Sequence, residues 1–172
     1  MVFGNPTDFA IEAETDALAG ASRGTVWGRM RIWCCGTPVG DFEEAHSGLS
    51  DAHQSLMELA SDLALLQNPA LAHLSDVEVW GLINTALYVD DGRTLQQIQR
   101  DSETWSRFNF LTNWGEPFDR YCGVIFKNAP DHLRILIRGS DDAVNGLSVT
   151  TFGFRGAVLA FDEWCRAQTA AA

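Results

Sequence analysis

The stretches YCGVIFK (residues 121–127) and HLRILIR (residues 132–138) are the clearest strands of this chain, and only four residues separate them. In the second stretch, Leu133, Ile135 and Ile137 are expected to point inward, and Arg134 and Arg138 to point away from the core. Alternation with period two indicates a strand with one buried face. The short connection makes the pair hairpin-like, and the two strands together predict antiparallel pairing.

Further strands are expected at both ends of the chain. Residues 9–13 and 25–35 alternate apolar and polar side chains, and a turn after the second stretch predicts a short return strand at 39–42. Residues 16–24 are small and polar and indicate a loop. Another strand is expected at 147–154.

The middle of the chain has helical spacing. A stripe of leucine and alanine over residues 49–66 predicts a helix with Ser50 as its N-cap, stopped by Asn68-Pro69. Residues 75–78 (SDVE) have the form of a capping box. They predict the start of a second helix, which ends at Asp90-Asp-Gly92.

Two more helices complete the expected elements, a weaker one over residues 95–108 and a closing one over residues 156–168. The total is about six strands and three or four helices. Because strands do not alternate strictly with helices, a doubly wound parallel sheet is disfavoured. We expect an α+β fold with a mainly antiparallel sheet. With no repeat or linker in 172 residues, a single domain over residues 1–172 is the simplest organisation.

The chain is acidic, with a formal net charge of −11. Its first 102 residues hold 15 acidic and 5 basic side chains, so nearly all of this charge lies there. Such a field repels nucleic acid and anionic membranes and attracts basic protein partners. Solubility alone explains acidity equally well, so the charge favours a basic partner without requiring one.

The cysteines and the hydropathy indicate a reduced, cytoplasmic protein. None of Cys34, Cys35, Cys122 and Cys165 forms a C-x-x-C pair, and all four fall in apolar runs where a free cysteine acts as a small hydrophobic residue. No stretch of 18 apolar residues predicts a membrane span, and the N-terminus lacks the features of a signal peptide.

No motif for catalysis, cofactor binding or metal binding is found. Nucleotide-binding glycine loops and the G-x-S-x-G serine signature are absent, and the four histidines lack metal spacing. We therefore expect no catalytic residue, no cofactor and no metal. Glu12 and Glu14 share a strand face and could act as acid and base in a small hydrolase, as could a Cys–His pair, but a solvated strand face is the simpler interpretation.

The six tryptophans are the other conspicuous feature. Helical phase places Trp80 and Trp164 in the core, whereas Trp27 and Trp33 share a strand face with arginines and are expected to be partly exposed. Trp114 lies in a loop beside Gly115. Tryptophan is enriched at binding hot spots and is also a common core residue.

Short motifs along nearly the whole chain resemble one protein family. Phe3-Gly-Asn-Pro6 followed by Asp8-Phe-Ala-Ile11-Glu12 resembles the opening of the immunity protein 42 family, which belongs to bacterial polymorphic toxin and contact-dependent competition systems. Later segments are similar in order and spacing: Trp27-Gly28, Ile32-Trp33, Val39-Gly-Asp-Phe42, Pro117-Phe-Asp119-Arg-Tyr121, residues 133–138, Phe152-Gly-Phe154 and Trp164.

This resemblance implies a cytoplasmic, non-enzymatic antidote that binds and neutralises the toxin domain of a secreted effector. A basic nuclease would suit the charge, while other toxins, and a monomeric or homodimeric state, remain open. The candidate contacts are acidic residues that steer a basic toxin and tryptophans that anchor it: Trp33, Asp41, Glu43, Glu44, Asp90, Asp91 and Trp114. The alternative functions are a small-ligand binding or adaptor module and, less favoured, a small hydrolase.

Overall fold

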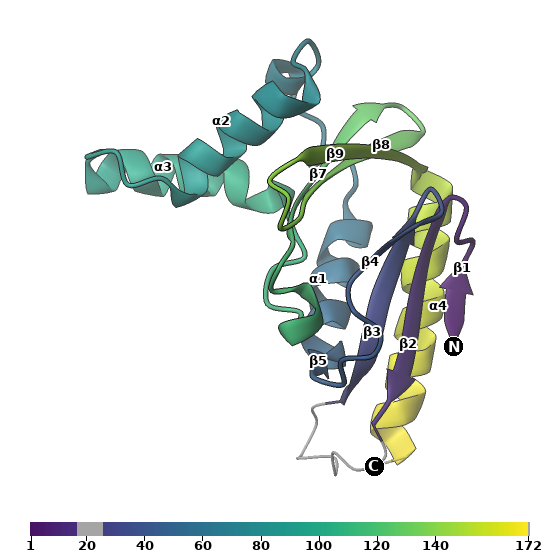
Figure 1. Ribbon diagram of the computed structural model, residues 1–172. Helices are drawn as coiled ribbons and strands as arrows, with labels where there is room; N and C mark the ends of the chain where they lie inside the picture. Colours follow the sequence, from purple (N-terminus) through teal and green to yellow (C-terminus); the bar gives the residue numbers. More distant parts are fainter. Residues whose placement is uncertain (17–25, 172) are drawn as a thin grey trace.

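Two antiparallel sheets and four α-helices make up the part of the chain that the computed structural model describes, residues 1–16 and 26–171 (Figure 1). The strands are β1 (Val2–Gly4), β2 (Phe9–Thr15), β3 (Trp27–Cys34), β4 (Thr37–Val39), β5 (Ser47–Gly48), β6 (Asn109–Phe110), β7 (Cys122–Ala129), β8 (His132–Arg138) and β9 (Val144–Thr150). The helices are α1 (Leu49–Ser61), α2 (Asp76–Tyr88), α3 (Leu95–Trp105) and α4 (Thr151–Ala171), with 3-10 turns at Pro69–Leu71, Ser106–Phe108 and Glu116–Phe118. The predicted α+β class and the antiparallel pairing are confirmed.

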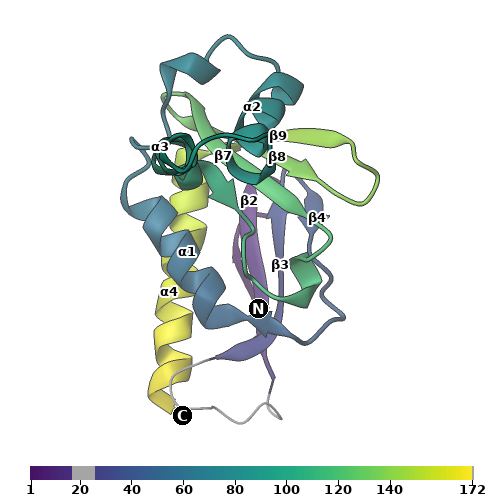
Figure 2. The ribbon, with the colours of Figure 1, turned by 90° about the vertical axis from the view of Figure 1, so that its left-hand side faces the viewer.

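The first sheet has the order β1-β2-β3-β4, and β5 pairs with the other end of β3. Helices α1 and α4 lie side by side against one of its faces (Figure 2). The alternation predicted for β3 is confirmed, because Met30 and Ile32 are fully buried while Arg29 and Arg31 on the opposite face are only half-buried. One face of this sheet therefore carries the core, and the other carries charge.

The second sheet has the order β6-β7-β8-β9. It contains the two strands from which the sequence predicts the fold, paired antiparallel with Ile125 opposite Ile135. Both of these side chains are fully buried. Strand β9 runs directly into α4, and α4 then packs along β1 and β2, so one helix joins the two sheets.

The last predicted strand is too long at its C-terminal end. Strand β9 stops at Thr150 rather than at Phe154, and the helix begins at Thr151 rather than at Gly156. The hydroxyl of Thr150 accepts a hydrogen bond from the backbone N–H of Gly153 at 2.9 Å, as an N-cap does. The alternation of phenylalanine and glycine at 152–154 imitates a strand, but these residues form the first turn of α4.

Two other predictions were wrong in their boundaries near the first sheet. The return strand is β4, at Thr37–Val39 instead of 39–42, because Gly40 turns the chain with a φ of +102°. Helix α1 starts at Leu49, so Ser50 is not its N-cap. The Ser50 hydroxyl instead accepts a hydrogen bond from the backbone N–H of Val26 at 2.8 Å.

Helix α1 also ends earlier than its apolar stripe suggests, at Ser61. Leu66 belongs to that stripe and is buried, yet it lies beyond the helix, where its carbonyl accepts a hydrogen bond from the backbone N–H of Lys127 on β7. In the predicted helix 95–108, α3 ends at Trp105 and a 3-10 turn follows. Most of the predicted 16–24 loop lies outside the described residues.

Three of the nine strands in the described ranges, β1, β5 and β6, were not predicted. Each has two or three residues, too few to show a period of two. The capping box at Ser75 is confirmed, since Ser75 accepts a hydrogen bond from the N–H of Glu78 and the Glu78 carboxylate accepts one from the N–H of Ser75. Helices α2 and α3 form a hairpin, here called the arm, that extends away from the first sheet and α4 (Figure 1).

Candidate partner-binding surfaces

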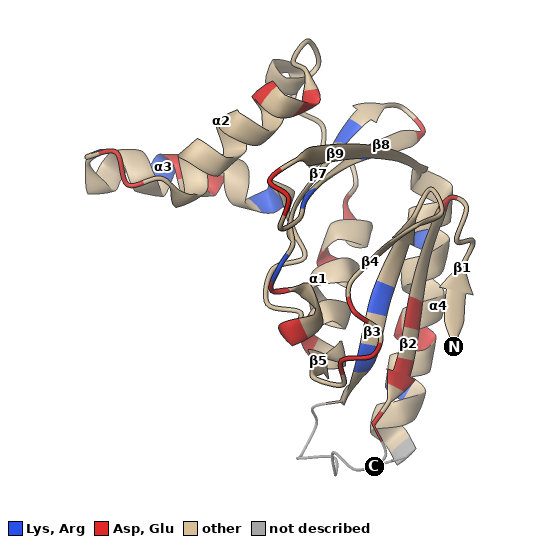
Figure 3. Cartoon of the chain, viewed as in Figure 1, with Lys and Arg blue, Asp and Glu red and all other residues tan. Residues whose placement is uncertain are grey.

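The outer face of the first sheet carries Trp33, the first predicted anchor. Figure 3 shows the acidic segments of β2 lying beside the basic segments of β3. Glu12 accepts a hydrogen bond from Nε of Arg31 at 2.7 Å and another from Nε1 of Trp33 at 3.0 Å. The Arg31 guanidinium also lies over the rings of Trp33 and Phe42, at 4.6 and 5.0 Å from their centroids. Trp33 is therefore half-buried and held rigidly, as a binding anchor must be.

The pKa of Glu12 is lowered even though its burial acts in the opposite direction, because the hydrogen bonds from Arg31 and Trp33 and the charge of Arg31 stabilise the carboxylate. A carboxylate held ionised in this way is a poor proton donor near neutral pH. The pairing thus gives Glu12 a structural role in place of the hydrolase role considered for Glu12 and Glu14.

The loop between β4 and β5 carries three more predicted contacts, Asp41, Glu43 and Glu44. Asp41 lies 3.3 Å from Arg120, and Glu43 lies 3.8 Å from Arg29. Glu44 accepts a hydrogen bond from His46 at 2.9 Å, and this bond, together with the nearby Glu116 carboxylate, raises the pKa of His46. Exposed pairs of this kind stabilise a fold little, so the carboxylates can exchange their partners for the cations of another protein.

Glu44, His46 and Glu116 also come together in a way that the sequence did not predict. Their ligand-type atoms lie within 4.8 Å of one another, which is close enough to hold a metal ion. All three side chains are substantially exposed. The pairing of an imidazole with two carboxylates accounts for this arrangement without an ion, so we assign no metal there.

The arm carries the last two predicted acidic contacts, Asp90 and Asp91, in the link between α2 and α3. Asp91 is bound by Arg93, whose guanidinium also reaches Asp101 on α3 at 2.7 Å. The same guanidinium donates to three carbonyls at the end of α2: Thr85, Ala86 and Val89. Arg93 therefore fixes the two helices of the arm to each other, while Asp90 stays at the exposed tip.

Apolar side chains are unusually exposed on the arm. Leu95 is 84% exposed and Tyr88 is 61% exposed. The others are Leu74, Val77, Leu82, Val89 and Ile98. Helix α3 buries none of its residues. Exposed apolar surface gathered on one projecting element is typical of a protein-interaction site. The sequence of α2 indicates this surface, because its apolar residues fall on more than one face of the helix.

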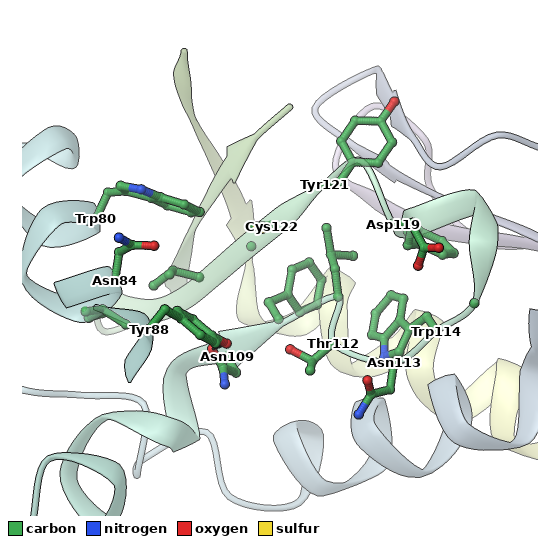
Figure 4. Close-up of a pocket in the computed structure, with 17 residues that line it drawn as sticks. Trp80, Asn84, Tyr88, Asn109, Thr112, Asn113, Trp114, Asp119, Tyr121 and Cys122 are labelled. Atoms are coloured by element: carbon green, nitrogen blue, oxygen red, sulfur yellow. Dashed lines mark hydrogen bonds between the residues drawn. The ribbon is translucent and has the colours of Figure 1, made fainter. Parts of the chain in front are cut away.

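At the base of the arm lies a groove with a volume of about 220 Å³. Its walls are α2, β6, the start of β7 and the 111–119 loop (Figure 4). The lining is mostly apolar and aromatic, with Trp80, Phe110 and Trp114 among its residues. Asp119 is the only charged residue in this lining. Sequence reasoning missed the groove, because it joins residues from three separate segments.

Trp114, the second predicted anchor, lines this groove but is only 1% exposed. Its ring packs edge-to-face against Phe110 and Phe118, with centroid distances of 5.3 Å in both cases. It therefore offers almost no surface to a partner in this conformation and pins its loop to the core. Its Nε1 is buried and has no hydrogen-bond partner in the described residues.

The remaining tryptophans largely follow their helical or strand phase. Trp80 is buried, Trp164 is partly buried against the core, and Trp27 is exposed. Two cysteines differ from the expectation, because Cys35 and Cys122 are exposed. Cys122 is the first residue of β7, and Cys35 lies in the turn that follows β3.

Two groups that could serve a hydrolase lie between α1 and α4. His53 is hydrogen-bonded through Nε2 to Asp162 at 2.7 Å, and Arg166 donates to the same carboxylate at 2.9 Å. Nearby, burial raises the pKa of the Cys165 thiol to about 12. A thiol that stays protonated is a poor nucleophile, so this geometry does not favour a Cys–His enzyme.

Within the described residues, no helix combines the length and the hydrophobicity that crossing a membrane requires. No curated protein and no solved structure matches the chain. A family model does match: the model described as immunity protein 42 covers residues 1–159, from β1 into the first half of α4. This match spans both sheets, the arm and the groove, and the chain therefore belongs to the immunity protein 42 family.

Proposed function

We propose that this chain binds the toxin domain of a cognate secreted effector in the cell that produces both, and neutralises it by covering the toxin surface without catalysis. Membership of the immunity protein 42 family is the observation that carries the proposal. The expected place of action is the cytoplasm, where a toxin domain made by the same cell or delivered by a neighbour would be intercepted.

The charge of the chain supports a basic toxin domain as the partner. With a net charge of −11, the chain attracts a basic protein over distances of about 8–10 Å at physiological salt. Glu43 and Asp90 are exposed and Asp41 is half-buried, and all three lie in loops, where a partner can reach them. A basic nuclease is one partner of this kind, and the acidic surface would compete with nucleic acid for its active site.

The exposed apolar side chains of the arm support burial after the electrostatic encounter. Rigid, half-exposed apolar and aromatic groups contribute most of the affinity at protein interfaces. Tyr88 on the arm and Trp33 on the first sheet are aromatic groups held by hydrogen bonds, and Leu95 on the arm adds exposed apolar surface. These residues, together with the acidic loops, are the contact candidates that we propose.

The groove is the observation that favours the small-ligand alternative. Its volume of about 220 Å³ is smaller than the roughly 300–1,000 Å³ of sites that bind drug-sized ligands. A groove of this size holds a side chain or two more readily than a whole cofactor. We therefore favour the protein-binding function.

A growth-rescue experiment tests the proposed function. The C-terminal domain of the secreted protein encoded beside this gene is expressed alone and together with this chain, and growth is measured. Relief of toxicity, with a 1:1 or 2:2 complex in size-exclusion chromatography with light scattering, is the expected result. Unrelieved toxicity, or the absence of a complex between the purified proteins, would contradict the proposal.

A further inference from the structure

We propose that the groove at the base of the arm is the docking site for a basic segment of the toxin domain, with one apolar side chain on the groove floor and one Lys or Arg side chain at Asp119. This inference rests on the proposed function and adds the place and the chemistry of contact. Figure 4 shows Trp80, Asn84 and Tyr88 at one end of the groove and Trp114 and Asp119 at the other.

The apolar end of the groove is held in place before any partner arrives. The Tyr88 hydroxyl donates to the Asn109 side chain at 2.8 Å, which ties α2 to β6 across the groove. Leu111 and Asn113, which also line the groove, have positive φ values of 69° and 62°, an uncommon backbone conformation. A site whose walls are already ordered loses little entropy when a partner side chain enters.

The charged end of the groove is a carboxylate without a cation. Asp119 forms no ion pair or side-chain hydrogen bond among the described residues, although Arg120 is its neighbour in sequence. Arg120 instead pairs with Asp41 and lies over the Tyr121 ring, at 5.3 Å from its centroid. Among the described residues, no Lys, Arg or His lines the groove, so a cation that pairs with Asp119 there would be supplied by a partner.

The apolar lining and the unpaired Asp119 carboxylate together determine which kind of protein segment the groove can bind. An anionic segment would meet an unpaired carboxylate and no positive charge, whereas the aliphatic stem of Lys or Arg can pack on the apolar lining with its charged end at Asp119. Aromatic walls also attract cations through their ring faces. The same chemistry agrees with the acidity of the whole chain, which favours a basic partner.

Two substitutions test the two ends of the groove. Asn84→Trp places an indole in the groove from a half-buried residue that makes no side-chain hydrogen bond among the described residues. Asp119→Arg reverses the charge at the other end. Glu163→Arg is the matched control, because it makes the same change in net charge at an exposed site on α4. Circular dichroism and thermal melting establish that each variant is folded.

The binding constant of each variant for the neighbouring toxin domain is measured by titration calorimetry. We expect each groove substitution to weaken binding by at least about 30-fold, as at an interface hot spot, and Glu163→Arg to change it by no more than about twofold. Wild-type binding by a folded Asn84→Trp variant would overturn the inference and leave the proposed function intact. No binding by the wild-type chain would overturn both.

Hydrogen exchange on the wild-type complex gives a second readout that no mutation can disturb. Slower exchange of the amides at 109–115 and 121–124 in the complex is the expected result. Unchanged exchange there, while growth is still rescued, would place the toxin on another surface. Protection of these amides by free argininamide or by self-association, without protection by the toxin, would assign the groove to a small ligand or a second copy and overturn the inference.

Discussion

The carboxylate of Asp8 accepts two hydrogen bonds from Thr150, one from its backbone N–H at 2.8 Å and one from its hydroxyl. Asp8 lies in the turn between β1 and β2, and Thr150 is the N-cap of α4. These two hydrogen bonds therefore connect the β1–β2 turn of the first sheet to the residue at which the second sheet ends and α4 begins.

Replacing Asp8 with alanine is expected to lower the free energy of unfolding by about 1–3 kcal/mol, because the Thr150 N–H loses its acceptor and a carboxylate is removed from a helix N-terminus. Urea denaturation measures this change. Asp8→Asn keeps one acceptor oxygen and should restore part of the loss. Equal stability of the Asp8→Ala and wild-type proteins would show that the contact contributes nothing.

Two glycines of α4 should respond in opposite directions to alanine. A Cβ at Gly153 would lie 2.1 Å from Oδ2 of Asp8, so Gly153→Ala must displace that carboxylate and destabilise the protein. A Cβ at Gly156 would meet nothing within 4 Å. Gly156→Ala should therefore stabilise the helix by about 0.5–1 kcal/mol. Thermal melting of the two variants compares them directly, and a stabilising Gly153→Ala substitution would contradict this account.

Trp114→Phe is expected to lower the free energy of unfolding much less than Trp114→Ala. Phenylalanine keeps a ring between Phe110 and Phe118 and removes a buried N–H that has no acceptor. Removing an unpaired donor relieves a desolvation cost of about 1–3 kcal/mol, which offsets part of the lost volume. Alanine leaves a cavity and should cost about 3–5 kcal/mol. If chemical denaturation gives equal losses for both variants, the N–H has a partner such as an ordered water.

The hydrogen bonds of Glu12 predict a pH dependence of stability. Its pKa is lower in the folded chain than in the unfolded chain, so its contribution is fully present above the unfolded value and is lost as the pH falls through the folded value. We expect the difference in unfolding free energy between wild type and Glu12→Gln to be largest near neutral pH and to shrink below about pH 4. A difference that does not change with pH would contradict this assignment.

Association with the toxin domain should slow as salt is added. Electrostatic steering raises association rates by about 10–10³-fold and is screened by ions. Stopped-flow association rates at several NaCl concentrations measure this effect, with Asp90→Asn and Glu43→Gln reporting on the arm and on the β4–β5 loop. The variant with the shallower salt dependence identifies the loop that faces the toxin. A rate that is independent of salt would remove steering from the mechanism.

The sequence predicted those parts of the fold that depend on local pattern. The inward positions of Leu133, Ile135 and Ile137 on β8 and the capping box at Ser75 depend on neighbouring residues alone, and both are confirmed. The end of β9 involves instead a distant contact, through Asp8, and Leu66 is likewise held by a distant contact, with Lys127. No window of sequence around Thr150 or Leu66 contains that information.

The contrast between local pattern and distant contacts also applies to the residues of the candidate surfaces. Trp33 was expected to be partly exposed because of its strand phase, and it is. Trp114 was placed in a loop, but its near-complete burial depends on Phe110 and Phe118 folding around it. The unpaired state of Asp119 also follows only from the structure, since Arg120 is adjacent in sequence and pairs elsewhere.

The residues of the opening motif that resembles the family have structural roles in the fold. Gly4 has a φ of +96°, and a Cβ there would lie 2.5 Å from the Phe9 carbonyl oxygen. The Phe9 ring packs against Phe154 on α4, with a centroid distance of 4.8 Å. These residues identify the fold, so they are poor guides to where a partner binds.

The way in which α4 completes the first sheet has a consequence for synthesis on the ribosome. Strands β1 and β2 are made well before the helix that covers their apolar face, because that helix begins at Thr151. Until that segment leaves the exit tunnel, Phe9 and Ile11 lack the neighbours that bury them in the finished protein. The apolar face of the first sheet is therefore completed only after α4 has been synthesised and has left the ribosome.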